Sequence, residues 1–348
     1  MILIDGSQGE GGGQVLRTAL TLSILTGQAF RMENIRARRS QPGLMAQHLK
    51  SVDAAAAISR AQVQGSASGS RWVEFRPGEI RSGRYRFDIS TAGATSLVLQ
   101  TIFLPLSLAR SASTVTITGG THALWSPIFH YLDLHWLPYL LQMGFDARLS
   151  MDIAGFFPQG GGRLNATIRP AGPLSPLTII QRGRLLHIQG ISAVANLNLS
   201  IADRQKRQAL RRLEKCCPGT KIKTVQLPAQ SKGTFLLLLA EFEFSRCCYF
   251  ALGELGKPAE RVADEAVDAL EAFLETGAAI DQYLADQLLL PLSLAGSPSE
   301  IKTCQVTQHL LTNAAIIQVF SHAEINIQGE LGQPGLVRVI PSRTIDHA

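Results

Sequence analysis

The alternation of hydrophobic and polar positions predicts a threefold pattern of helix, strand and second helix. Apolar residues at helical spacing predict first helices at residues 14–25, 95–108 and 283–294. After a short polar break, segments of strand-like composition predict strands at 30–36, 114–118 and 300–306. Second helices are expected at 45–58, 128–143 and 309–320, with further strands at 72–75 and 164–168.

A short motif repeats within this pattern. The sequence Pro-Leu-Ser-Leu-Ala at 105–109 recurs unchanged at 291–295, and a weaker copy stands at 21–25. Each copy ends one of the apolar helices. The distance along the chain from the copy at 105 to the copy at 291 exceeds the distance from 21 to 105 by about 100 residues, the size of a small domain. We therefore expect an α+β protein of three repeated units, with an independent domain inserted between the second and third.

The composition of the connecting segments predicts where these domains meet. Residues 170–176 are rich in proline, which is typical of a linker, and 276–279 return to the larger domain. The expected boundaries are 1–179 and 279–341 for the large domain, 180–278 for the insert, and 342–348 for a tail. Within the insert we expect strands at 185–191, 221–226, 235–244 and 248–254 and helices at 202–216 and 258–274.

Charge and composition indicate an ordered protein with a basic bias. The 348 residues include 33 Lys and Arg against 27 Asp and Glu, a net charge of +6 that favours a polyanionic partner. Six of the basic residues lie on the predicted helix 202–216, which is either a solvated face or an RNA-contacting surface. No segment has the pattern of a membrane span or secretory signal, so we expect no membrane association and a cytoplasmic location, or a nuclear one in a eukaryote.

The first strand runs into a glycine-rich loop within residues 5–17. Five glycines in the eight positions 6–13 allow close approach of a ligand to the backbone. The loop lacks the Gly-Lys-Ser/Thr of a Walker A motif and the spacing of a dinucleotide fingerprint. From the loop alone, a bound ligand and a bare tight turn remain equally plausible interpretations.

Polar side chains on apolar helices are the other candidates for chemistry. Buried polar groups need partners, so their presence on core helices suggests a shared polar site where the units meet: Gln14, Arg17, Gln100, Asp286 and Gln287. Arginines at 36, 38 and 39 suit phosphate oxygens. His309 follows Thr307, a plausible N-cap, at a helix N-terminus that favours neutral imidazole; taken alone, such a histidine is more often structural.

Other site chemistries lack their motifs. The five cysteines do not have zinc-site spacing, and their odd number argues against a secreted disulfide framework. No His-Glu-x-x-His sequence and no Gly-x-Ser-x-Gly elbow occur. A zinc hydrolase and a serine hydrolase of the elbow type are therefore disfavoured.

Taken together, the motifs resemble the RNA 3′-terminal phosphate cyclase family. The residues that carry the resemblance occur in family order at 5–17, 36–39, 41–44, 47–49, 96–101, 119–121, 157–162, 283–288 and 309–313. The resemblance implies a large domain of three four-stranded-sheet and two-helix units, similar to the C-terminal domain of a translation initiation factor, and a smaller thioredoxin-like insert.

The resemblance also implies a reaction and its participants. An RNA 3′-phosphate would become a 2′,3′-cyclic phosphate, with ATP consumed to AMP and pyrophosphate through a histidine-AMP intermediate and an RNA-AMP anhydride. His309 would carry the AMP, and Glu10 would hold a divalent cation, Mg or Mn. The phosphate and RNA-end site would comprise Arg17, Arg36, Arg39, Gln47, His48 and Gln100. Pro127 and Tyr283 would sandwich the adenine, with Asp286 at the ribose and Gln287 near the base.

The segment 122–130 departs from the family pattern, with His130 at the position where an acidic residue is expected. Two other functions are compatible with parts of this pattern. A catalytically silent, cyclase-like ribosome-assembly factor would share the fold but lack the histidine that stands here at 309. An enolpyruvyl transferase would need lysine-rich substrate clamps, which these loops do not contain. The sequence does not predict an oligomeric state.

Overall fold

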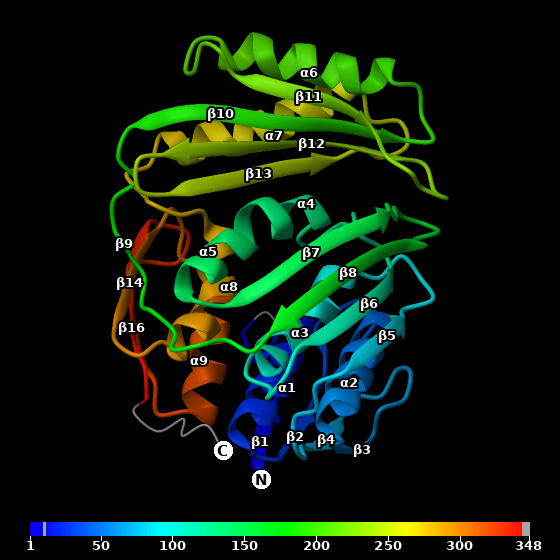
Figure 1. Cartoon of the computed structure of the whole chain (residues 1–348), viewed down its shortest axis with the longest axis vertical. Helices are drawn as coiled ribbons and strands as arrows, with labels where there is room; N and C mark the ends of the chain where they lie inside the picture. Colours follow the sequence, from blue (N-terminus) through cyan, green and yellow to red (C-terminus); the bar gives the residue numbers. More distant parts are fainter. Residues whose placement is uncertain (10–11, 343–348) are drawn as a thin grey trace.

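The backbone builds mixed sheets covered by helices in a computed structural model that describes residues 1–9 and 12–342 (Figure 1). The described residues form four separate four-stranded sheets, each combining parallel and antiparallel pairs. The α+β class expected from the sequence is therefore confirmed. None of the helices in these described ranges is long and apolar enough to cross a membrane.

Three of the sheets have the same order and the same strand directions. Their orders are β1-β2-β4-β3, β5-β6-β8-β7 and β9-β14-β16-β15, with the first two strands parallel and the remaining pairs antiparallel. The first contains β1 (Ile2–Asp5), β2 (Phe30–Glu33), β3 (Gln62–Gln64) and β4 (Val73–Arg76). The second contains β5 (Arg84–Asp88), β6 (Ser113–Gly119), β7 (Asp146–Ile153) and β8 (Gly162–Arg169). The third contains β9 (Thr178–Ile179), β14 (Ser299–Thr303), β15 (Glu324–Gln328) and β16 (Gly335–Ile340).

The helices that accompany these sheets form the main core. They are α1 (Gly13–Thr26), α2 (Ala46–Ser59), α3 (Thr95–Ser107), α4 (Phe129–Tyr131), α5 (Leu137–Met143), α8 (Gln282–Ser293) and α9 (Gln308–Phe320). A π-helical turn, Leu132–Trp136, joins α4 to α5. The repeated motif lies at the same place in two of them, with Pro105 and Pro291 in the last turns of α3 and α8. The prediction that each of these motif copies ends an apolar helix is confirmed.

The fourth sheet forms its own layer at the top of Figure 1. Its order is β11 (Lys221–Gln226), β10 (Leu185–Ala195), β12 (Gly233–Phe242) and β13 (Arg246–Leu252). Helices α6 (Ser200–Leu213) and α7 (Ala259–Leu274) pack on this sheet and on each other. Their buried residues form a second hydrophobic cluster that includes Leu236, Leu238, Val262 and Leu270.

One predicted strand ends earlier than expected. The sequence predicted a strand through Arg36, but β2 ends at Glu33. Asn34 and Arg36 both have a φ of 54°, a left-handed conformation that ends an extended strand. This turn lies where the arginine-rich segment begins. The predicted strand 300–306 likewise ends at Thr303.

Candidate functional site

A cavity of about 720 Å³ opens where α1, α3, α8 and α9 meet the loop 123–127 and β13. Six of the residues expected to bind nucleotide or phosphate line it together with the expected nucleophile: Arg17, Gln100, Pro127, Tyr283, Asp286, Gln287 and His309. The polar residues that interrupt the apolar helices therefore do share one site. The cavity also includes residues of β13, of the loop that follows it and of α7, among them Tyr249, Lys257 and Glu265, which sequence reasoning did not select.

His309 stands on the first turn of α9 beside α1. The hydroxyl of Thr307 caps this helix by accepting a hydrogen bond from Leu310 N at 3.0 Å, as the sequence predicted. Nδ1 of His309 donates a hydrogen bond to Oε1 of Gln14, an atom that can only accept. The proton on a neutral ring is thereby placed on Nδ1 and the ring lone pair on Nε2.

Arg17 lies in the wall of the cavity near Asp286. Desolvation by the surrounding protein lowers the pKa of Arg17 to about 10, while the negative charge of Asp286 opposes this shift. The guanidinium therefore keeps its charge at neutral pH. A charged guanidinium in the wall of a cavity favours the binding of an anionic ligand such as a phosphate.

A chain of amide hydrogen bonds orients the polar face of α8. Gln100 Nε2 donates to Gln287 Oε1 at 2.7 Å, and Gln287 Nε2 donates to the carbonyl oxygen of Tyr283 at 2.8 Å. From α9, Asn313 Nδ2 donates to the carbonyl oxygen of Asp286 at 3.1 Å. Tyr283 is 52% exposed, so its ring is available to a ligand.

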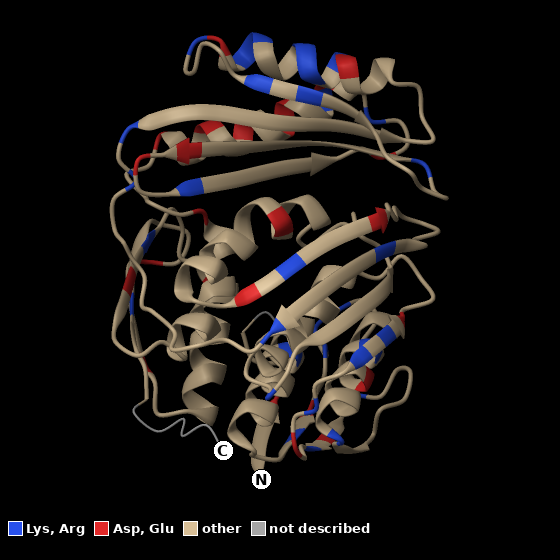
Figure 2. Cartoon of the chain, viewed as in Figure 1, with Lys and Arg blue, Asp and Glu red and all other residues tan. Residues whose placement is uncertain are grey.

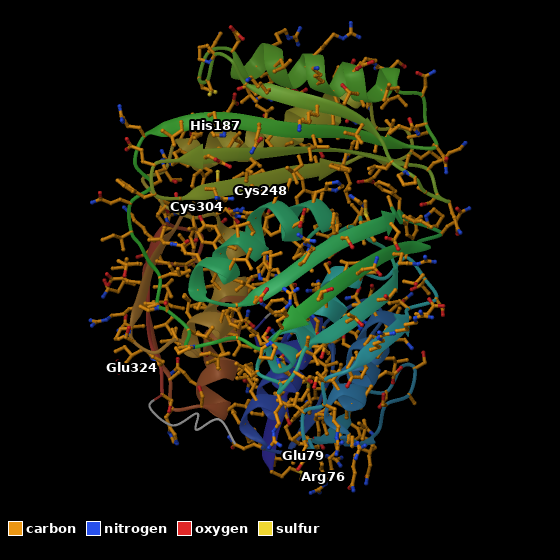
Figure 3. The ribbon with its side chains drawn as sticks, in the orientation of Figure 1. Arg76, Glu79, His187, Cys248, Cys304 and Glu324 are labelled. Atoms are coloured by element: carbon orange, nitrogen blue, oxygen red, sulfur yellow. The ribbon has the colours of Figure 1, made fainter. Side chains whose placement is uncertain are left out.

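The N-terminus of α8 is fixed by a buried carboxylate that the sequence analysis missed. Asp281 Oδ1 accepts from Tyr283 N at 3.1 Å and Leu284 N at 2.8 Å. Its Oδ2 lies 2.6 Å from His135 Nε2, and Tyr131 Oη donates to Oδ1 at 3.3 Å. An Asp two residues before the predicted helix 283–294 is an N-cap signal that could have identified it. Cys248 and Cys304, labelled in Figure 3, lie in this same region, where Cys304 Sγ donates to Gln282 Oε1 at 3.0 Å.

The remaining phosphate-site candidates, Arg36, Arg39, Gln47 and His48, do not line this cavity. Two of them lie against the glycine-rich loop instead. A Cβ at Gly12 would stand 3.3 Å from Arg39 Nη2, and one at Gly13 would stand 2.2 Å from His48 Nε2 and 2.9 Å from Arg17 Nη1. Arg17 thus connects the cavity with this second group.

His48 is held as a neutral hydrogen-bond donor. Its Nδ1 accepts from Met45 N at 3.2 Å, which places the ring proton on Nε2, the atom facing Gly13. Desolvation, with smaller effects of Arg17 and Arg36, lowers the pKa of His48 to about 3. The ring therefore stays neutral throughout the physiological range.

The candidates outside the cavity form a second group: Arg36, Arg39, Gln47 and His48. Two of them, Arg36 and Gln47, form hydrogen bonds with backbone atoms of neighbouring loops. Arg36 Nη1 donates to the carbonyl oxygens of Gln41 at 2.7 Å and Gly43 at 3.0 Å. Gln47 Oε1 accepts from Ala94 N at 2.9 Å. These contacts stabilise the loops beside α2, so part of each side chain's role is structural.

The expected cation ligand, Glu10, lies outside the described residues, as do residues 343–348 of the expected tail. Over residues 1–9 and 12–342, no three His, Cys, Asp or Glu side chains gather closely enough to form a metal site.

The unusual segment 122–130 forms a buried histidine pair that packs against aromatic residues of the main hydrophobic core. His122 is 1% exposed and stacks between Phe156 and Phe235, with ring centroids 4.8 Å away on each side. Its Nε2 lies 3.0 Å from Nδ1 of His130. Desolvation lowers the pKa of His130 to about 4 and that of His122 well below its usual value. Pro127 nevertheless lines the cavity.

The basic helix α6 is partly neutralised within the protein. Figure 2 shows Lys and Arg along α6 and acidic residues along α7, and the two helices pack against each other. Arg204 pairs with Glu260 at 2.7 Å, and Arg212 pairs with Asp264 at 3.3 Å and Asp268 at 2.6 Å. These pairs support the interpretation of α6 as a solvated face that packs on its neighbour.

The chain is similar to known proteins over nearly its whole length. A family model for RNA 3′-terminal phosphate cyclases matches residues 8–327. Proteins named RNA 3′-terminal phosphate cyclase share 43% identity in Nostoc punctiforme, 45% in Ralstonia nicotianae and 43% in Caldivirga maquilingensis. These alignments cover 94%, 94% and 93% of this chain and 96%, 94% and 94% of the relatives.

A solved structure, the enolpyruvyl transferase NikO from Streptomyces tendae, also aligns with the chain. The alignment covers 99% of this chain and 66% of that one, at 12% identity and a TM-score of 0.27. A similarity this low supports no conclusion about fold or function.

Proposed function

Because the chain belongs to the RNA 3′-terminal phosphate cyclase family, we propose that it converts an RNA 3′-phosphate into a 2′,3′-cyclic phosphate with ATP. The observation that carries the proposal is the position of His309. Its ring lies in the cavity with Arg17, Asp286 and Tyr283, and the hydrogen bond from Nδ1 to Gln14 leaves the lone pair on Nε2, which supports Nε2 as the nucleophile.

The reaction proceeds in three displacements at phosphorus. His309 Nε2 attacks the α-phosphorus of ATP, and the bond to pyrophosphate breaks. An oxygen of the RNA 3′-phosphate then attacks the same phosphorus, so that AMP passes from the histidine to the RNA as an anhydride. Finally the vicinal 2′-hydroxyl loses its proton and attacks the 3′-phosphorus, and AMP leaves. The activation is needed because an unactivated phosphate oxygen is a poor leaving group.

The residues of the cavity are suited to hold the nucleotide. Tyr283 and Pro127 present flat apolar surfaces for the two faces of the adenine. Asp286 suits the ribose hydroxyls as a hydrogen-bond acceptor, and the amide of Gln287, the next residue of the same helix, suits an edge of the base. The charge of Arg17 in the cavity wall is suited to stabilise negative charge that develops on the phosphate during the displacement.

The second group is proposed to receive the RNA end. Arg39 and His48 lie against the glycine-rich loop, where a guanidinium and an Nε2–H donor both suit phosphate oxygens. Arg36 and Gln47 brace the adjoining loops, and Gln100 connects to the nucleotide side through Gln287. Arg17 touches both groups, as an enzyme that transfers AMP from one phosphate to another requires.

A divalent cation, Mg or Mn, is proposed to assist the displacement of pyrophosphate, with Glu10 as its protein ligand. A carboxylate is a suitable ligand for either ion, and most of the remaining positions on such ions are commonly filled by substrate phosphates and water. The ion would neutralise charge on the leaving group.

The fold is proposed to consist of three repeats and an insert. The support is the identical strand order in three sheets, together with the separate hydrophobic cluster of the fourth sheet. In this view 1–179 and 279–341 form the large domain, 180–278 the thioredoxin-like insert, and 342–348 a tail. The pairing of β9 with β14 joins the chain before the insert to the chain after it.

The competing function is a catalytically silent ribosome-assembly factor. The presence of His309 in contact with Gln14, and its place in the cavity, favour catalysis instead. The test uses an oligoribonucleotide with a 3′-phosphate, incubated with the protein, ATP and magnesium or manganese. We expect a product that resists phosphatase, and no reaction with the matched 3′-hydroxyl oligonucleotide. Failure to cyclise the 3′-phosphate under these conditions would contradict the proposal.

A further inference from the structure

Trp125 is an exposed aromatic residue in an unfavourable backbone conformation at the edge of the cavity. Its side chain is 98% exposed, and its φ of 60° lies in the left-handed region that bulky residues rarely adopt. Both features are unfavourable for the protein alone, since a large apolar surface stays in water and the backbone is strained. Trp125 also lines the cavity that contains His309.

The loop that carries Trp125 is anchored on both sides. His122 is buried between two phenylalanine rings, and Ile128 is fully buried. Phe129 N donates to the carbonyl oxygen of Thr121 at 2.9 Å, which closes the base of the loop. Within it, Ser126 Oγ donates to the carbonyl oxygen of Ala123 at 2.9 Å. The tryptophan is therefore presented by a fixed support.

The adenine of ATP does not account for this ring. In the proposed function Tyr283 and Pro127 occupy the two faces of the adenine, which leaves no face for a third stacking partner. The cavity volume of about 720 Å³ lies high in the range of roughly 300–1,000 Å³ usual for small-molecule sites. The reaction brings a second nucleoside to His309, the one that carries the 3′-phosphate.

We propose that the indole of Trp125 stacks on the base of the 3′-terminal nucleotide of the RNA. This inference rests on the proposed function and adds a base-binding subsite to it. Stacking on an aromatic ring suits an enzyme that accepts different RNA ends, because every base has a π-face. The subsite would hold the terminal ribose at the cavity, with its 3′-phosphate beside Arg17, the residue that connects the cavity with the second group.

The test compares two RNA substrates in two variants. One oligoribonucleotide carries a 3′-phosphate on an ordinary terminal nucleotide, and the other carries it on an abasic terminal ribose. On the ordinary RNA, Trp125→Ala should lower kcat/KM for cyclisation by about tenfold or more, mainly through KM, and Trp125→Phe should retain most of it. For the wild-type protein, kcat/KM on the abasic RNA should be lower than on the ordinary RNA by a similar factor. Trp125→Ala should not lower kcat/KM on the abasic RNA any further.

Phe244→Ala is the matched control, because Phe244 is 67% exposed and does not line the cavity. An equal loss for Trp125→Ala on both RNAs would overturn the proposal, as would full activity on ordinary RNA. A matching loss in adenylylation by ATP without RNA would reassign Trp125 to the nucleotide. A changed solution mass with unchanged cyclisation would reassign it to a contact between copies. Wild-type protein that cyclises neither RNA would instead defeat the proposed function itself.

Discussion

Gln14 on α1 accepts a hydrogen bond from Nδ1 of His309 on α9, across a separation of 295 residues. This contact joins the end of the glycine-rich loop to the residue that we propose as the nucleophile. It also fixes which ring nitrogen carries the proton, and so which nitrogen can attack. Gln14, at the end of the glycine-rich loop, therefore orients the ring of the proposed nucleophile.

Removing this acceptor should slow adenylylation without weakening ATP binding. Gln14→Leu is expected to lower kcat for the histidine-AMP step by about tenfold to a hundredfold, since a bond to a reacting ring is worth about 1–3 kcal/mol. Gln14→Glu keeps an acceptor oxygen and should retain more activity. Single-turnover kinetics with labelled ATP measure the rate of adenylylation separately from the affinity for ATP. A Gln14→Leu variant that loses only ATP affinity would refute the orienting role.

Gly13 should tolerate no side chain. A Cβ there would stand 2.2 Å from His48 Nε2 and 2.9 Å from Arg17 Nη1, so Gly13→Ala must displace one or both of these groups. We expect a loss of cyclase activity of at least tenfold although alanine is the better helix former. Gly172→Ala is the matched control, because a Cβ at Gly172 has no neighbour within 4 Å. Equal activity in the two variants would show that this close contact is unimportant.

Asp281 should support both stability and nucleotide binding. Asp281→Ala removes the cap of α8 and leaves buried partners at His135 and Tyr131 unsatisfied, so we expect at least about 2 kcal/mol of destabilisation. Because Tyr283, Asp286 and Gln287 lie on this helix, KM for ATP should also rise. Calorimetry and ATP titration measure the two effects. Asp53→Ala, at an exposed ion pair, should change neither.

The His122–His130 pair should make the fold sensitive to mild acid. Burial holds the folded pKa of His130 near 4 and that of His122 well below normal, whereas an unfolded histidine has a pKa of about 6.5. Below about pH 6.5 the unfolded chain takes up protons at these histidines while the folded chain does not. The free energy of unfolding therefore has its full value above about pH 6.5 and falls as the pH drops toward 4. Each group contributes up to about 1.4 kcal/mol per pH unit.

Melting temperatures measured from pH 7 to pH 4 test this expectation. His130→Asn keeps an acceptor oxygen for His122 but cannot titrate, so its melting temperature should depend less on pH over that window. The exposed His322 supplies the control, since His322→Asn should leave the wild-type profile unchanged. A variant at His130 with the full wild-type pH dependence would contradict the account.

Local pattern was sufficient for much of the fold. Helix α9 begins after the Thr307 cap as predicted, and the helices α1, α3 and α8 follow their apolar periodicity. The end of β2 was predicted wrongly because the left-handed turn there is formed by Asn34 and Arg36, and no glycine marks it in the sequence. The strands β5 (Arg-Tyr-Arg-Phe-Asp) and β15 (Glu-Ile-Asn-Ile-Gln) were not predicted, although apolar and polar residues alternate in both, as in a half-buried strand.

The sequence predicted several of the residues that line the site, but it did not predict which residues contact one another there. Polar residues on apolar helices indicated a shared site, and Gln14, Gln100 and Asp286 do meet in one cavity. The pairing of His135 with Asp281 joins residues 146 positions apart, and no local pattern encodes such a partner. The exposure and strained backbone of Trp125 likewise depend on how its loop is anchored in three dimensions.

His309 is proposed to carry the AMP, and covalent labelling is the most direct test of this role. The protein is incubated with α-labelled ATP and magnesium or manganese, without RNA, and then denatured. We predict a covalent adenylate that is labile to acid and stable to alkali, absent from His309→Ala and present in the control His322→Ala. Label retained in His309→Ala would contradict the account.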